Sequence, residues 1–264
     1  QPAYTGKPAL YLADQTGDTL RLPAGSRVQL RFYGEPGGLI LSETVSARTE
    51  VPPASEMKQE FVVLQSGRLQ IEGRGGRDWQ VEVIPDGAPT VEVKAEIGRE
   101  ADGRFRQEFS ASDDYGVTKG QVVIRLDLAA VDRRFGLATE PDAIPEMVLD
   151  LPMPVRGDRK KFTELLVDDL SKTILSNQPV TMSYSVTDAA GQVAEAPPLS
   201  VTLPGRRFFD PFAAAVVEMR RDLMWSRANA PRVAQILRAM TWKPEGLFSN
   251  RTAFLRLRVA MKRL

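Results

Sequence analysis

The chain has 264 residues, of which 42% are hydrophobic, and it contains neither histidine nor cysteine. Without histidine it lacks the usual general base near neutral pH and the commonest metal ligand. Without cysteine it lacks thiol nucleophiles, disulfides, zinc knuckles and iron–sulfur sites. The composition therefore predicts a globular protein that is not an enzyme and that holds neither a cofactor nor a metal.

The formal net charge is +1, but the charge is divided unevenly along the chain. Residues 205–264 hold 13 of the 35 Lys and Arg residues and 4 of the 34 Asp and Glu residues, a net charge of +9, which leaves −8 on residues 1–204. A basic segment that follows an acidic one predicts different tasks or different neighbours for the two parts.

Residues 1–87 alternate between apolar and polar side chains, which predicts half-buried strands and a first β-sandwich domain. Trp79 lies in one of these strands and is predicted to fill the sandwich core. The segment Pro85–Pro89 contains two prolines and a glycine, which favours a turn or a stiff linker and marks the domain boundary. We expect strands around Val28–Phe32, Leu39–Leu41, Phe61–Leu64, Leu69–Ile71 and Trp79–Val83.

Residues 88–204 repeat this pattern, with a long connection over Leu128–Asp158 that contains one strand. Two consecutive all-β units of this size predict tandem immunoglobulin-like or fibronectin-like β-sandwiches. The expected strands of the second domain lie around Val91–Ile97, Val122–Leu126, Met147–Leu151, Val180–Val186 and Leu199–Leu203.

After Gly205 the apolar period changes from 2 to 3.6, which predicts a basic arm of three amphipathic helices over residues 205–264. Asp210 is a good N-cap for the first helix, with Pro211 at its first position, and Asn229 and Asn250 are candidate caps for the others. The apolar stripe of the third helix continues to Leu264 with no terminating glycine or proline. We therefore expect the arm to be truncated and the natural chain to continue.

The segment Tyr184–Ala194 resembles the last strands and turn of bacterial immunoglobulin-like repeats. Read together with Ser112–Val117, Leu203–Pro211, Arg220–Leu223 and Trp225–Pro231, it resembles the alphaproteobacterial branch of the domain of unknown function 4175 family. This resemblance implies transmembrane helices upstream, a periplasmic location attached to the inner membrane, and a helical and then low-complexity region downstream. The family offers no catalytic residues to carry over.

Clustered carboxylates are the first candidate site, because Asp113, Asp114 and Asp188 could bind a calcium ion or hydrolyse a glycoside. Each precedes a glycine in a predicted tight turn, so we favour a turn role and leave cation binding open. Asp168 and Asp169, within Leu165–Leu170, are predicted to lie in a solvated loop.

Two further features have simple structural explanations. The segment Gly73–Arg77 is superficially similar to a phosphate-binding loop but precedes a strand, so we predict a hairpin turn. Trp225 and Trp242 lie among apolar helical residues and are predicted to pack in a core or between helices.

The basic arm is the main candidate for partner binding, through Arg227, Arg232, Arg238, Arg251, Arg256 and Arg258. The expected partner is another protein or a second copy, and the arm could also dock on the acidic sandwiches or present a solvated polar face. Nucleic acid is not expected, because neither sandwich offers a basic aromatic platform.

The sequence thus predicts a non-enzymatic periplasmic interaction or scaffold region of a membrane-anchored envelope protein. One alternative is a carbohydrate-binding or carbohydrate-hydrolysing envelope module. The other is a binder of anionic membranes or nucleic acid through the basic arm.

Overall fold

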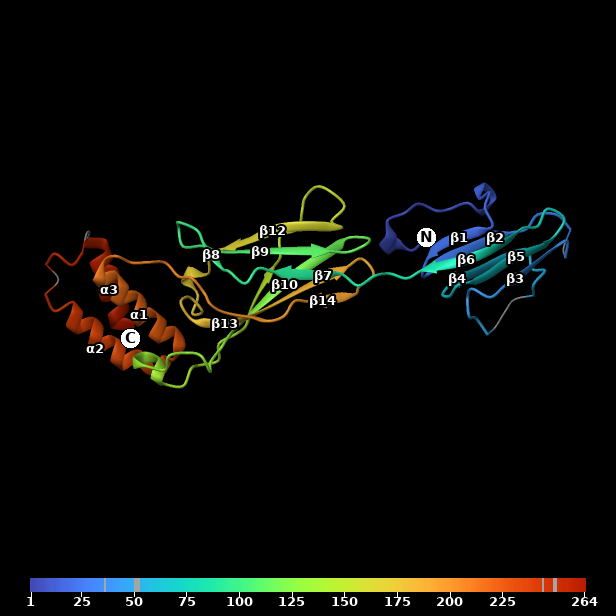
Figure 1. The fold of residues 1–264 in the computed structure, drawn as a ribbon. Helices are drawn as coiled ribbons and strands as arrows, with labels where there is room; N and C mark the ends of the chain where they lie inside the picture. Colours follow the sequence, from blue (N-terminus) through green and yellow to red (C-terminus); the bar gives the residue numbers. More distant parts are fainter. Residues whose placement is uncertain (36, 50–52, 244, 249–250) are drawn as a thin grey trace.

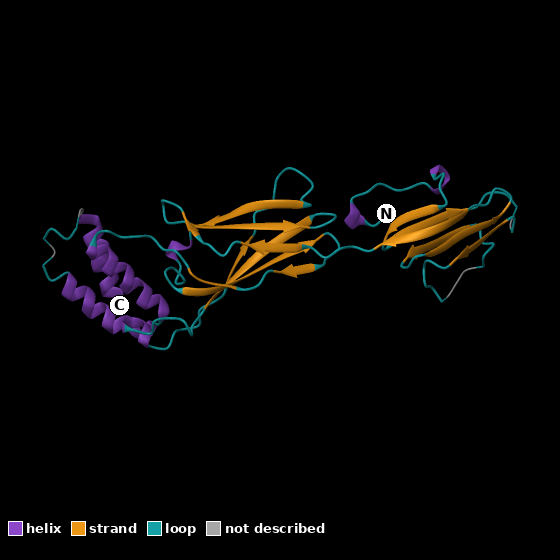
Figure 2. Cartoon of the chain, viewed as in Figure 1, coloured by secondary structure: helices purple, strands orange, loops and turns teal. Residues whose placement is uncertain are grey.

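The computed structural model describes residues 1–35, 37–49, 53–243, 245–248 and 251–264. It is mostly β-sheet with a helical segment at the C-terminal end, which confirms the predicted fold class. Figures 1 and 2 show three units in a row: the N-terminal sandwich at one end, the second sandwich in the middle and the helices at the other end. None of the helices in the described residues has the length and apolar character that a membrane span requires.

The first sandwich stacks a sheet of order β1-β6-β5-β3 on the pair β2-β4. Strand β1 runs parallel to β6, whereas the other neighbours are antiparallel. The alternation seen in the sequence buries Val28 and Leu30 from one sheet against Leu69, Trp79 and Val81 from the other, which places Trp79 in the core as predicted. The strands are β1 Thr19–Pro23, β2 Ser26–Arg31, β3 Leu39–Glu43, β4 Lys58–Val63, β5 Gly67–Gly73 and β6 Asp78–Ile84.

The second sandwich pairs a sheet of order β11-β10-β13-β14, in which β15 also pairs with β13, with a sheet of order β12-β9-β7, in which β8 also pairs with β9. Its core contains Phe105 and Phe109 from one sheet and Ile124, Met182 and Tyr184 from the other. The strands are β7 Thr90–Val93, β8 Gly98–Arg99, β9 Phe105–Ser112, β10 Val117–Leu126, β11 Met147–Asp150, β12 Lys161–Asp168, β13 Pro179–Asp188, β14 Val193–Glu195 and β15 Leu199–Thr202.

Two local predictions in the second sandwich are wrong. The strand expected to run to Ile97 ends at Val93, because the short strand β8 then pairs with the start of β9. The loop expected over Leu165–Leu170 is partly a strand, because β12 continues to Asp168 and pairs with β9 along its whole length. Asp169 follows β12 and accepts a hydrogen bond from the Ser171 backbone nitrogen at 3.2 Å.

The C-terminal segment forms helices α1 Pro211–Trp225, α2 Ala230–Met240 and α3 Arg251–Arg263. Helix α1 is capped as predicted, because the Asp210 carboxylate accepts a hydrogen bond from the Phe212 backbone nitrogen at 3.0 Å. Met219 of α1 packs with Val233 and Leu237 of α2, and α3 lies against this cluster through Leu257 and Met261. The predicted cap Asn250 lies outside the described residues.

Asn229 and Trp242 differ from their predicted roles. Asn229 precedes α2 but forms no side-chain cap, because its amide nitrogen donates instead to the backbone oxygens of Gly136 and Asp222, both at 2.8 Å. Trp242 follows α2 and is 82% exposed, so it packs in no core. Trp225 is fully buried, as predicted.

Candidate partner-binding surface

The six arginines proposed for partner binding lie around α2 and on α3, and five of them are exposed. The exception is Arg232, whose Nη1 lies 2.6 Å from Oδ2 of the buried Asp222. The Arg227 backbone nitrogen donates to the Asp142 carboxylate at 3.0 Å, but its side chain remains exposed. Arg232 therefore stabilises the arm itself, and the other arginine side chains face solvent.

Asp222 is the centre of the contact between the arm and the second sandwich. It is 1% exposed, and it lies directly against Gly136 in the long connection between β10 and β11. A Cβ atom at position 136 would lie 2.0 Å from Asp222 Oδ2, so only glycine leaves room for this carboxylate. Asn229 joins the two segments through its bonds to Gly136 and Asp222, and the arm is thereby held at a fixed place.

A small apolar cluster completes this contact. Trp225 at the end of α1 packs with Val131 and Leu137 of the connection, and its indole nitrogen donates to the Thr139 backbone oxygen at 2.8 Å. The Arg133 guanidinium lies over the Trp225 ring, 5.6 Å from the ring centre. The side chains of the arm that touch this connection are thus mostly uncharged or paired within the arm.

The ion pair between the start of the arm and the second sandwich involves none of the six arginines. Arg206 Nη2 lies 3.1 Å from Asp169 Oδ2, at the end of β12. Within the described residues, no ion pair links the six arginines to a carboxylate of either sandwich. The described contacts of the arm with the second sandwich therefore consist mainly of buried packing and of hydrogen bonds in which at least one partner is a backbone atom.

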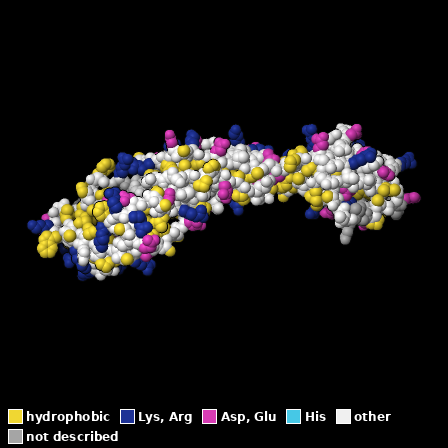
Figure 3. Space-filling view, turned by 60° about the horizontal axis from the view of Figure 1, so that its bottom comes forward, with side chains coloured by type: hydrophobic (Ala, Val, Ile, Leu, Met, Phe, Trp, Pro, Cys, Tyr) yellow, Lys and Arg dark blue, Asp and Glu magenta, His cyan; other side chains and the backbone are white. Residues whose placement is uncertain are grey.

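An apolar groove lies between the three helices and is called here the arm groove. It has a volume of about 550 Å³, and Met219 and Leu223 of α1 form its floor with Val233 and Leu237 of α2. Figure 3 shows hydrophobic side chains gathered among basic ones over this end of the molecule. Its remaining lining residues are Val216, Arg220 and Met224 from α1 and Arg256, Leu257, Val259, Ala260, Arg263 and Leu264 from the α3 segment.

The carboxylates at the junction of the two sandwiches stabilise the turns in which they lie. Asp113 Oδ2 accepts hydrogen bonds from the backbone nitrogens of Tyr115 and Gly116 at 2.9 and 2.6 Å, and Asp188 Oδ1 accepts one from Gln192 at 2.8 Å. The other carboxylate oxygen of each has no hydrogen-bond partner among the residues that the structure describes. In the described part of the chain, no three acidic groups come together as metal ligands.

The same junction affects Asp86, which lies in the linker between the sandwiches. Burial raises the pKa of Asp86, and the negative charges of Asp114, Asp188 and Asp113 raise it further. The Gln192 amide opposes this effect by donating to the Asp86 carboxylate at 2.6 Å. The linker thus forms a charged, partly buried contact with the second sandwich.

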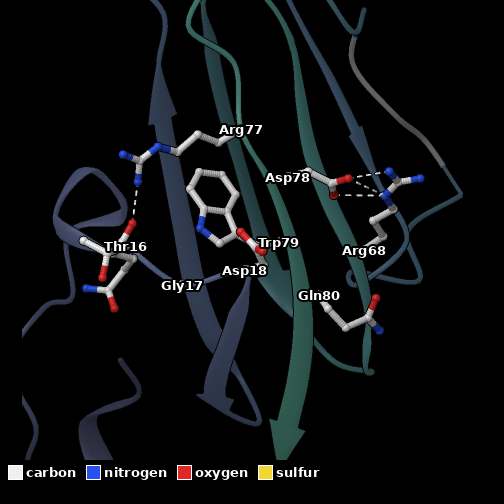
Figure 4. Close-up of a pocket in the computed structure, with 9 residues that line it drawn as sticks. Thr16, Gly17, Asp18, Arg68, Arg77, Asp78, Trp79 and Gln80 are labelled. Carbon is white, nitrogen blue, oxygen red and sulfur yellow. Dashed lines mark hydrogen bonds and ion pairs between the residues drawn. The ribbon is translucent and has the colours of Figure 1, made fainter.

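The first sandwich contains an open polar pocket of about 640 Å³ at the edge formed by β6 and the segment before β1 (Figure 4). Arg68 lies on the rim and forms an ion pair with Asp78, and this hydrogen bond holds the pKa of Asp78 below its usual range. Arg77 donates to the Gln15 backbone oxygen. Trp79 lines the pocket but is only 3% exposed, so it offers no open ring face for a sugar to stack on.

The glycine-rich segment Gly73–Arg77 forms the turn between the antiparallel strands β5 and β6, which confirms the hairpin prediction. Gly73 and Gly75 have φ angles of 122° and 82°, which side chains with a Cβ rarely adopt. The glycines of this loop are therefore explained by the positive φ angles that the turn requires.

Sequence reasoning missed the residues that fix the arm in place. Gly136, Asp222 and Asn229 are far apart in the chain, and each is an ordinary residue type in its own segment. The one available signal was an aspartate beside apolar residues of a helix, because Asp222 lies three residues after Met219 and residues at this spacing are neighbours on a helix surface. A buried carboxylate there needs a basic partner.

A family model described as "Domain of unknown function (DUF4175)" matches residues 1–264. The chain therefore belongs to this family. No curated protein is significantly similar to it.

Solved structures resemble the chain only weakly. Wild type OgpA from Akkermansia muciniphila is 16% identical over 44% of this chain and 29% of its own, with a TM-score of 0.30. BcpA, the major pilin subunit of Bacillus cereus, is 13% identical over 68% of this chain and 69% of its own, with a TM-score of 0.24. A chain in the complex of Dpr2 Ig1-Ig2 with DIP-Theta Ig1-Ig3 is 9% identical over 72% of this chain and 62% of its own, with a TM-score of 0.28. These likenesses contribute nothing to the functional argument.

Proposed function

We propose that this member of the DUF4175 family is a non-enzymatic interaction region of a membrane-anchored envelope protein, and that it works in the periplasm. The two sandwiches act as a spacer, and the helical arm is the part that binds a protein partner. The spacer holds the arm away from the N-terminal end of the region, where the anchor is expected.

The observation that carries this proposal is the way in which the arm is mounted. Trp225, Asp222 and Asn229 attach it to the second sandwich through buried contacts, so its position does not depend on the exposed arginines. The arm groove and the exposed arginines face solvent. A surface that combines an apolar groove with exposed positive charge is typical of a protein-binding site.

The polar pocket of the first sandwich supports an enzyme less well. A general acid needs a carboxyl group with a raised pKa, but the ion pair with Arg68 lowers the pKa of Asp78. The buried ring of Trp79 also differs from the open aromatic platforms that stack on sugars. The carbohydrate alternative therefore has less support than protein binding.

The proposal is tested by photo-crosslinking in the full-length protein in its native envelope. A photoreactive residue is placed at Arg238 or Val259 in the arm, and at the exposed Gln29 of the first sandwich as the matched control. We expect the arm positions to capture another protein and the control position to capture none. Adducts that contain only the bait, from both arm positions, would contradict the proposal.

The compartment is tested separately. Alkaline phosphatase is active only after export, so it is fused after Leu264 in the full-length protein. We expect an active fusion, and an inactive but stable fusion would contradict the periplasmic location.

A further inference from the structure

We propose that the arm groove receives an amphipathic helix with acidic flanks from a partner protein. This inference rests on the proposed function and names the chemistry of the partner. It follows from the shape of the groove, from its lining and from the sign of the charges around it.

The floor and rim of the arm groove suit the apolar face of a helix. Val233 and Leu237 are buried beneath it, whereas Met224, Val259 and Leu264 are 37%, 51% and 40% exposed on its sides. A concave apolar surface between helices is the usual receptor for an amphipathic helix, whose anchors repeat every three or four residues. The thioether side chain of Met224 can adapt to such anchors, because it is flexible and polarisable.

The charge around the arm groove selects an acidic helix. Arg220, Arg256 and Arg263 line it, and none of the described residues that line it is acidic. In the described residues, neither Arg256 nor Arg263 forms an ion pair, while Arg220 donates to the Lys172 backbone oxygen at 2.6 Å. An occupant with Asp or Glu beside its apolar stripe would pair with these arginines at a partly dry rim.

A second copy of the chain fits this groove less well. In a two-fold symmetric dimer the same patch meets itself, so the arginines of one copy would face those of the other. A flat anionic membrane also fits less well, because the floor includes Val233 and Leu237, whose side chains are buried and out of reach of a flat surface. The observations therefore favour a helical protein segment.

The test measures binding of fluorescent peptides to the whole 264-residue chain by anisotropy. The probe is a helical peptide of about 20 residues with leucines at three- and four-residue spacing and glutamates at its other positions. One control peptide carries lysines in place of the glutamates, and a second has the same composition in scrambled order. We expect the acidic probe to bind at least about tenfold more tightly than either control.

Variants of α3 test the site. Arg256→Glu combined with Arg263→Glu is expected to raise the Kd of the acidic probe at least about tenfold. The matched control, Lys243→Glu after α2 combined with Lys262→Glu, makes the same charge change at exposed residues that do not line the groove and is expected to raise the Kd less than about threefold. Ala260→Trp fills the groove without a charge change and is expected to abolish binding. Circular dichroism verifies that each variant keeps its helices.

Several outcomes would overturn the inference. These are equal binding of the acidic and basic peptides, equal loss in the two double variants, or unchanged binding by Ala260→Trp. A concentration-dependent dimer that Ala260→Trp abolishes would make a second copy the occupant. Tighter binding to phosphatidylglycerol vesicles, abolished by the same change, would make it a membrane. Crosslinks to a protein that survive the Arg256 and Arg263 changes would reject this groove and leave the proposed function standing.

Discussion

Asp222 shows how one residue determines where the helical arm sits. Its carboxylate is buried, pairs with Arg232, and fits against a glycine whose missing side chain makes the space. A buried charge is costly unless it is paired, so this arrangement has few alternatives of similar free energy. The arm therefore has one preferred position on the second sandwich, even though only some of the interactions of Asp222 are strong.

Gly136→Ala tests this contact. The new Cβ would lie 2.0 Å from Asp222 Oδ2, so the carboxylate must move and α1 must shift or lose its partner. We expect the free energy of unfolding of the arm to fall by about 2 kcal/mol, the usual cost of overpacking a buried site. Urea denaturation followed by tryptophan fluorescence measures this change.

The matched control is Gly17→Ala, because its added Cβ would meet no atom closer than 4.0 Å. We expect this change to alter the free energy of unfolding by less than about 0.5 kcal/mol. A similar effect of the two substitutions would show that the fit of Gly136 against Asp222 is unimportant.

At the scale of elements, local signals were sufficient for the ends of some helices and insufficient for others. Asp210 and Pro211 predicted the start of α1, because capping depends on residues that are adjacent in sequence. Asn229 was assigned the same role from the same kind of signal and instead bonds a segment 93 residues away. Tertiary contacts decided that case, and a single sequence does not reveal them.

Some strands were likewise predicted from the local sequence, and others were missed. The alternation around Val28–Leu30 and Val180–Val186 predicted β2 and β13, because one face of each strand is buried. Strand β9 also alternates, but it lies between turn residues and went unassigned. Strand β12 was mistaken in part for a loop, because its acidic end at Asp168 has the composition of a loop and is held by pairing with Phe105.

The exposure of Trp242 and the presence of the arm groove also depend on tertiary contacts that a single sequence does not reveal. Trp242 was expected in a core because its neighbours are apolar, but it lies just beyond the end of α2 and points to solvent. The arginines of the arm were identified from sequence, whereas the groove beside them depends on how three helices pack. Charge is a property of residues, and a concave surface is a property of their arrangement.

The cap of α1 gives a prediction at this scale. Asp210→Ala removes the acceptor for the Phe212 backbone nitrogen, and we expect the arm to lose about 1 kcal/mol of stability. Thermal melting followed by circular dichroism measures the loss. Asp14→Ala is the matched control, because Asp14 is exposed, and we expect its effect to stay within about 0.5 kcal/mol. Equal melting of the two variants would mean that the cap contributes nothing.

At the scale of the whole molecule, the relation between the two sandwiches depends on a few contacts. The ring of Tyr4 meets that of Tyr115 edge to face, with centres 5.2 Å apart, and Gln192 bonds Asp86 in the linker. These contacts tie the N-terminal segment and the linker to one end of the second sandwich. The negative charges of the carboxylates gathered there repel one another, so the stability of the junction is expected to depend on pH.

Asp86→Asn tests this response. The folded chain raises the pKa of Asp86, so its contribution to stability is fully present below the pKa of the unfolded chain and is lost as pH rises through the folded pKa. Asparagine keeps an acceptor for Gln192 but never ionises. We therefore expect the variant and the wild type to have the same melting temperature near pH 3.5. At pH 7 we expect the variant to have the higher melting temperature, as measured by differential scanning calorimetry. Melting differences that stay constant across this range would contradict the assignment of Asp86 as the titrating group.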